Sequence, residues 1–198
     1  MTQEAQSTAL SSLRSASGSE LEAIVKNYRE QRQSDIQELM SIVGEQEATL
    51  IKTQRVVNNS REWFAIVLLG DIQPAAAAPL LARLISVRDS SFSLVSDEGG
   101  PHWYSFPAAV ALSKIGIPAI EPLLELARTS SLTSTVFHLC GVTLEATLGE
   151  ELALSAVKQY ARQHPELSQK DRLTALTTLV RAGHKRWTAY GTPNFLPE

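Results

Sequence analysis

The sequence has one cysteine and no long apolar run, and these two absences exclude several classes of protein. Cys140 is the single cysteine in 198 residues, so no disulfide forms within the chain and nothing requires an oxidising compartment. The longest apolar run near the middle, residues 63–69, is far shorter than the ~20 residues of a membrane span. The first residues lack the basic and apolar regions of a secretory signal. We therefore expect a cytoplasmic protein without a membrane span.

Glycine, proline and aromatic residues are also few. Nine prolines, ten glycines and 43% hydrophobic residues exclude collagen, low-complexity chains and wholesale disorder. A chain of this length can bury a continuous core, and it predicts one domain, with or without a tail.

Positive charge is scarce in the middle of the chain. Residues 63–156 carry a net charge of -5, whereas residues 157–198 carry +4 and the whole chain carries -3. A protein that wraps duplex DNA presents a basic stripe on its binding face. The acidic middle therefore disfavours nucleic acid as the partner.

The two ends differ in composition from the centre. Residues 1–18 are rich in serine and threonine and carry few apolar side chains, which predicts a disordered tail. A helical-repeat domain is expected over residues 19–187, followed by a C-terminal tail over 188–198.

Capping signals divide the first part of this domain into helices. Ser19 and Glu22 have capping-box spacing, and Gly44 is a natural residue to end the helix that follows. A second helix is expected over about 46–57, and Ser60 is expected to cap the next one. These two N-terminal helices could form a degenerate helix pair.

The centre of the chain repeats itself with an offset of 43 residues. Residues 65–72 align with 108–115, and Pro79-Leu80-Leu81 aligns with Pro122-Leu123-Leu124. Each unit reads as an apolar helix, a tight turn and a second helix that prolines open, where a missing N–H costs little. Two helices per unit at such a period are typical of an α-solenoid.

The segments Leu69-Gly70-Asp71 and Ile117-Pro118-Ala119-Ile120-Glu121-Pro122-Leu123-Leu124 resemble bacterial HEAT-like repeats of the short type. The resemblance implies an all-α fold, a short right-handed superhelix of helical hairpins. It covers units at 61–88 and 107–128, a weaker third unit with helices near 133–148 and 150–163, and a final helix over 169–182 that stops at Gly183. The core that the repeats share should consist of Val67, Leu68, Leu81, Val110, Leu112, Leu123 and Leu124.

No motif for a nucleotide, a metal or a cofactor is present, so we expect no catalytic residue, no metal site and no cofactor. Cys140 lies in an apolar stretch and is expected to be a buried hydrophobe, with His138 on another face of the same helix. Glu150 and Glu151 open a helix, where negative charge is favoured by the macrodipole.

The segment 89–106 is longer than the usual connection between repeats, and long loops are often functional. Adjacent Trp and Tyr residues offer large contact area at low entropic cost. The predicted partner-binding residues are Asp97, Glu98, His102, Trp103 and Tyr104. The alternative is that the two aromatic side chains fold back and seal the gap between two repeats.

A secondary basic patch is predicted at Arg181, Lys185 and Arg186, next to His184 and Trp187. It could contact a phosphate backbone or an acidic partner. The alternative is that cations simply gather at the C-terminus of a helix, where the macrodipole favours them.

Taken together, these patterns favour a non-catalytic protein–protein interaction or scaffold module, which binds a protein partner through its concave helical face and the 89–106 loop. The alternative is an enzyme, or an assistant of one, on a HEAT-like scaffold. Two such families resemble the chain in fold or in repeat sequence: the HEAT-like alkylpurine DNA glycosylases and the phycobilin lyases. Trp63, Trp103 and Asp71 are the candidates for a glycosylase site, although no catalytic motif of either family matches residue by residue.

Overall fold

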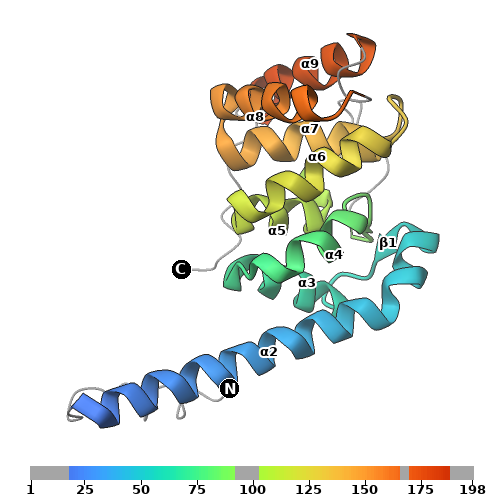
Figure 1. The fold of residues 1–198 in the computed structure, drawn as a ribbon. Coiled ribbons are helices and arrows are strands. Elements are labelled where there is room, and N and C mark those ends of the chain that lie inside the picture. Colours follow the sequence, from blue (N-terminus) through green and yellow to red (C-terminus); the bar gives the residue numbers. More distant parts are fainter. Residues whose placement is uncertain (1–17, 92–102, 166–169, 188–198) are drawn as a thin grey trace. The chain divides into compact units, whose positions relative to one another are not determined.

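The computed structural model describes residues 18–91, 103–165 and 170–187, and their fold is all-α (Figure 1). The chain divides into two compact units, Met1–Glu38 and Leu39–Glu198. The tails predicted over 1–18 and 188–198 lie outside the described residues, except for Gly18. The helices are α2 (Gly18–Thr53), α3 (Arg61–Ile72), α4 (Ala78–Arg83), α5 (Pro107–Ile115), α6 (Ile120–Thr129), α7 (Thr135–Leu148), α8 (Glu150–Gln163) and α9 (Lys170–Trp187).

Helix α2 is continuous, so the predicted break at Gly44 is wrong. A glycine inside a helix costs only about 0.5–1 kcal/mol relative to alanine. In the second unit, Val43 and Leu50 lie two turns apart on one side of α2, and both are buried in the core. Glu47, between them, accepts hydrogen bonds from Arg83 of α4. A single uninterrupted helix keeps all three contacts on the same side, which outweighs the weak glycine signal.

Helices α3 to α8 follow one another as three helix–turn–helix segments, α3–α4, α5–α6 and α7–α8, in the order in which the sequence predicts helices. Ser60 caps α3 by accepting a hydrogen bond from the backbone N–H of Trp63, and Ser134 caps α7 in the same way. Short 3-10 turns, η1 (Ala75–Ala77) and η3 (Ile117–Ala119), lead into the second helices of the first two pairs. The turn within each pair contains a residue with positive φ: Gln73, Gly116 and Gly149.

The helices of the second unit form two layers. The first layer is α3, α5, α7 and α9, in which each helix packs against the next, and the second layer is α4, α6 and α8, which also contact one another in order. Figure 1 shows these helices following one another in chain order from α3 to α9.

The core lies between the two layers, and four of the seven predicted core residues are confirmed. Leu81, Leu112, Leu123 and Leu124 are buried, whereas Val67 and Val110 are half-buried. The prediction for Leu68 is wrong, because 43% of this residue is exposed. Its side of α3 is opposite to the side that packs on α5.

A short parallel strand pair in the second unit was not predicted. Two-residue strands β1 (Arg55–Val56) and β2 (Arg88–Asp89) pair in parallel, with Val56 opposite Asp89, and they join the segment before α3 to the segment after α4. Strands this short leave no periodic signal in a sequence.

Helix α9 runs to Trp187, so the predicted end at Gly183 is wrong. Gly183 is buried beside α7, where an added Cβ would lie 3.5 Å from Oε2 of Glu145. Here glycine is a packing residue inside the helix and does not end it.

Candidate functional site

The predicted partner-binding segment is described only at its two ends. Asp97, Glu98 and His102 lie outside the described residues, so binding by this segment stays a prediction. Trp103 and Tyr104 belong to the 3-10 helix η2 (Trp103–Ser105), and both are half-buried.

Trp103 anchors the C-terminal end of this segment to α7. Its indole Nε1 donates a hydrogen bond to Oγ1 of Thr143, over 3.2 Å, and Thr143 is fully buried. The ring also packs against the hydrophobic core. The structure therefore packs Trp103 against the helical body, and whether the aromatic pair also binds a partner stays a prediction.

Asp89 anchors the N-terminal end of the segment in a similar manner. Its buried carboxylate accepts a hydrogen bond from Nε1 of Trp63 at 2.7 Å. The other carboxylate oxygen accepts from the backbone N–H and the hydroxyl of Ser91, each at 2.8 Å. The bond to Ser91, two residues on, is an Asx turn, and the Asp-Ser-Ser sequence was the signal for it.

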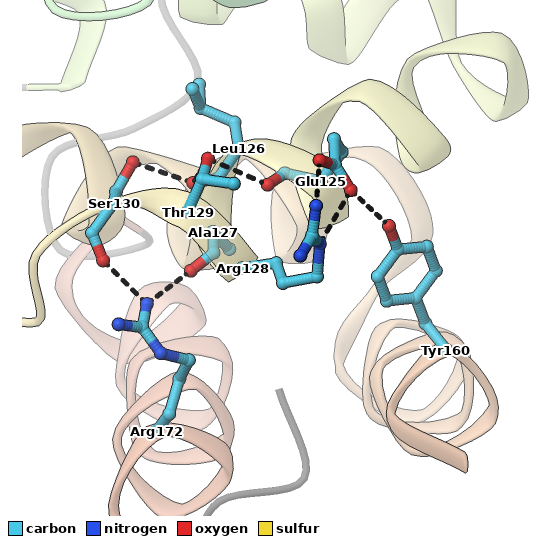
Figure 2. A network of polar contacts seen from close by, with 8 residues as sticks. All are labelled: Glu125, Leu126, Ala127, Arg128, Thr129, Ser130, Tyr160 and Arg172. Carbon is cyan, nitrogen blue, oxygen red and sulfur yellow. Dashed lines mark hydrogen bonds and ion pairs between the residues drawn. The ribbon is translucent and has the colours of Figure 1, made fainter. Parts of the chain in front are cut away.

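A polar network joins α6, α8 and α9, and it was not predicted as a unit (Figure 2). The carboxylate of Glu125 accepts two hydrogen bonds from the guanidinium of Arg128, one turn further along α6. It also accepts a hydrogen bond from the hydroxyl of Tyr160 on α8, at 2.8 Å. The ring of Tyr160 stacks on that of His164, with 3.9 Å between the centroids.

The electrostatics of this network are those of a structural contact. Hydrogen bonds from Arg128 and then Tyr160 lower the pKa of the Glu125 carboxyl to about 2. Burial, followed by the hydrogen bond to Glu125, raises the pKa of Tyr160 to about 12. A general acid or base works best with a pKa near the ambient pH. Both pKa values are moved away from neutrality, and the hydrogen bond between the two side chains links α8 to α6.

Arg172 of α9 completes the network at the C-terminus of α6. Its Nη1 donates hydrogen bonds to the carbonyl oxygens of Ala127, at 2.7 Å, and Ser130, at 2.6 Å (Figure 2). The last carbonyls of a helix lack intrahelical partners, and a cation favours the negative end of the helix dipole. The guanidinium carbon also lies 5.7 Å from the centroid of the Phe137 ring.

The single cysteine has a buried side chain. Cys140 is fully buried, and burial raises the pKa of its thiol well above the usual range, so the expectation of a buried hydrophobe is confirmed. His138, two residues earlier, is exposed on another side of α7, as predicted. The expected location of Glu150 and Glu151 is also confirmed, since both are exposed in the first turn of α8.

The candidates for a glycosylase-like site are each bonded to a different partner. Trp63 donates to Asp89, Trp103 donates to Thr143, and Asp71 pairs with Lys114 at 2.6 Å. Each of these bonds joins different parts of the helical body, so the three candidates do not form one cluster through their polar groups.

Of the predicted basic patch, Arg181 is exposed on α9. Lys185 and Arg186 belong to the last turn of the same helix, and their side chains lie outside what the structure describes. Within the described ranges, no group of His, Cys, Asp or Glu side chains is arranged to hold a metal ion. None of the helices described here contains a stretch long and apolar enough to cross a bilayer.

Exposed apolar and acidic side chains lie at the start of α6 and at the start of α8, two second-layer helices that contact each other. Ile117, just before α6, is 79% exposed, and Leu152, in the first turn of α8, is 63% exposed. Exposed glutamates accompany them on both helices. We call this set the α6/α8 rim: Ile117, Glu121, Glu150, Glu151 and Leu152.

Comparisons with protein-family models, with curated proteins and with solved structures return no match.

Proposed function

We propose that this chain is a non-catalytic protein-interaction module, built on a short α-solenoid of HEAT-like helix pairs. The repeat register supports the solenoid. Asp71 and Lys114, which the 43-residue offset aligns, form an ion pair between α3 and α5. The same offset aligns Gln73 with Gly116, and both have positive φ in the turn of their pair.

The α6/α8 rim is the observation that carries the proposed function. It exposes two large aliphatic side chains beside three carboxylates on adjacent second-layer helices. A solenoid uses the surface along its stacked repeats for binding, and an apolar surface rimmed by charge is typical of a protein interface. Carboxylates repel a phosphate backbone, so the rim favours a protein partner with basic and apolar residues over nucleic acid.

We assign the concave binding face to the second layer, with the 89–106 loop as its additional contact. Trp103 and Asp89 hold the two ends of this loop on the helical body.

Site-specific photo-crosslinking in native lysate tests the rim. A benzophenone amino acid is placed at Ile117 or at Leu152, and a matched control carries it at Thr129, exposed at the opposite end of α6. We expect the same protein to be captured from both rim positions and not from Thr129. Capture equal to that at Thr129, or products sensitive to nuclease, would overturn the proposal.

The contribution of the loop is tested with variants that keep its anchors. The triple variant Asp97→Ala, Glu98→Ala, His102→Ala should reduce recovery of the captured partner without a change in melting temperature. Replacing Trp103 by Ala should lower the melting temperature, because it breaks the bond to Thr143. Full recovery of the partner by the triple variant would remove the loop from the binding site.

A further inference from the structure

One side of α3 is left exposed although it carries two large apolar residues. Arg61, Phe64, Leu68 and Asp71 follow one another at spacings of three and four residues, so they line one side of the helix. Phe64 is 49% exposed and Leu68 is 43% exposed. We call this stripe the α3 outer face: Arg61, Phe64, Leu68 and Asp71.

The corresponding side of α5 is covered. The 43-residue offset aligns Phe64 with Pro107 and Leu68 with Ala111, and both α5 residues are buried. Ala111 lies directly against Gly70 of α3. This side of a first-layer helix is therefore the side that packs on the preceding first-layer helix.

Helix α3 has no such preceding helix among the described residues of its unit. The sequence predicts a helix pair before α3, but residues 39–53 of this unit continue α2 as a single helix. The outer face of α3 is thus the end of the first layer, and an end of this kind needs a polar surface or a cover.

We propose that a second copy of this chain covers the α3 outer face, with the two α3 helices antiparallel about a two-fold axis. Position 66 lies midway between Phe64 and Leu68, and also midway between Arg61 and Asp71. In an antiparallel pair, Phe64 faces Leu68 of the second copy and Arg61 faces Asp71 of the second copy. An isologous interface requires such self-complementarity.

Charge decides between the two possible orientations. A parallel pair would place Arg61 against Arg61, whereas the antiparallel pair places opposite charges together at both ends of a stripe about 15 Å long. Arg61 already lies 3.6 Å from Glu45, and Asp71 lies 2.6 Å from Lys114, but these side chains stay at least one third exposed and remain available to a second partner. A single helix stripe buries less surface than the roughly 1,200–2,000 Å² of a stable complex, so the dimer is weak.

Sedimentation equilibrium of the full chain over a wide concentration series tests this arrangement. We expect a monomer–dimer equilibrium that Leu68→Glu abolishes. Arg61→Glu and Asp71→Arg should each weaken association about tenfold. In a two-fold symmetric dimer each substitution occurs in both copies, so it disrupts both Arg61–Asp71 pairs of the interface. The double variant Arg61→Glu, Asp71→Arg should restore association. Melting temperatures establish that all the variants fold.

Two outcomes would overturn the inference: a wild-type chain that stays monomeric at every concentration, or a double variant no better than the single ones. In the first case another segment of the chain or an unlike partner covers the face. Lys114→Gln is the matched control, since it breaks the ion pair with Asp71 but leaves the outer face intact. The proposal rests on the packing of α3 and α5 and is independent of the α6/α8 rim.

Discussion

Gly70 of α3 and Ala111 of α5 are in direct contact, and a Cβ added to Gly70 would stand 2.7 Å from the Cα of Ala111. This distance is too short for two carbon atoms, so only glycine permits the spacing between the two helices. Asp71, the residue after Gly70, forms an ion pair with Lys114, which lies one turn after Ala111 on α5. The register of the first two helix pairs thus depends on a steric fit reinforced by charge.

Gly70→Ala should destabilise the protein by about 1–3 kcal/mol, because the atom it meets belongs to the backbone and cannot rotate away. Gly44→Ala is the matched control, since it also lies inside a helix but a Cβ added there would meet no atom of another segment within 4 Å. It should stabilise α2 by about 0.5–1 kcal/mol. Urea denaturation measures both changes, and a neutral Gly70→Ala would show that α3 and α5 are less closely packed.

Leu81→Ala and Leu124→Ala should each reduce the free energy of unfolding by about 2–5 kcal/mol, because each removes a buried side chain and leaves a cavity. Leu152→Ala, at a residue that is 63% exposed, should change it by no more than about 0.5 kcal/mol. Equal losses at buried and exposed positions in chemical denaturation would contradict the layered core.

Gly116→Ala should cost about 1–3 kcal/mol, because Gly116 has φ +80° and ψ -136°, a conformation open almost only to glycine. The space around it is open, so the loss would come from the backbone and not from a clash. Gln73→Gly, at the aligned turn with φ 59°, should be neutral or stabilising. Thermal melts of the two variants should therefore move in opposite directions, or only the Gly116 variant should shift.

Glu125 should make stability depend on acid pH. Its pKa is lowered to about 2 in the folded state, so the unfolded chain binds a proton at higher pH than the native one. The stabilisation is present above pH ~4.5 and is lost as the pH falls toward ~2. Because 47% of the Glu125 side chain is exposed, solvent screening limits it to about 1 kcal/mol. Wild type and Glu125→Gln should differ above this window and converge below it in acid denaturation.

Tyr160→Phe separates the effect of Tyr160 on the pKa of Glu125 from the effect of Arg128. Without the phenol hydroxyl, the pKa of Glu125 should rise from about 2 while the bonds from Arg128 keep it below its usual range. A titration of the Glu125 carboxyl by NMR measures this change. An unshifted pKa of Glu125 in Tyr160→Phe would place Tyr160 outside the network.

In the wild type, the neutral form of Tyr160 should contribute stability below pH ~10 that is lost as the pH rises through ~12. Absorbance of the phenolate follows this transition.

Local signals in the sequence were sufficient for the helix pairs. Ser60 and Ser134 cap their helices through their own side chains, and Gly149 turns the chain between α7 and α8. The apolar pattern around Cys140 correctly predicted a buried thiol. Each of these features depends on residues within a few positions of one another, and that is the range over which caps, turns and helical periodicity act.

The candidate site was predicted less completely. The sequence singled out Trp103, but its bond to Thr143 spans 40 residues, and the bond between Trp63 and Asp89 spans 26. The hydrogen bonds from Arg172 to the end of α6 cross more than 40 residues. No local pattern marks such partners, because they meet only once the layers have packed.

The sequence by itself determined that this protein is helical, where its central pairs begin and turn, and that its one thiol is buried. Only the tertiary structure decided that α2 passes through Gly44, that α9 passes through Gly183, and that Leu68 remains exposed. The physical reason is one of magnitude. A glycine disfavours a helix by about 1 kcal/mol, and a few buried contacts between distant residues exceed that amount, so packing overrides the local preference.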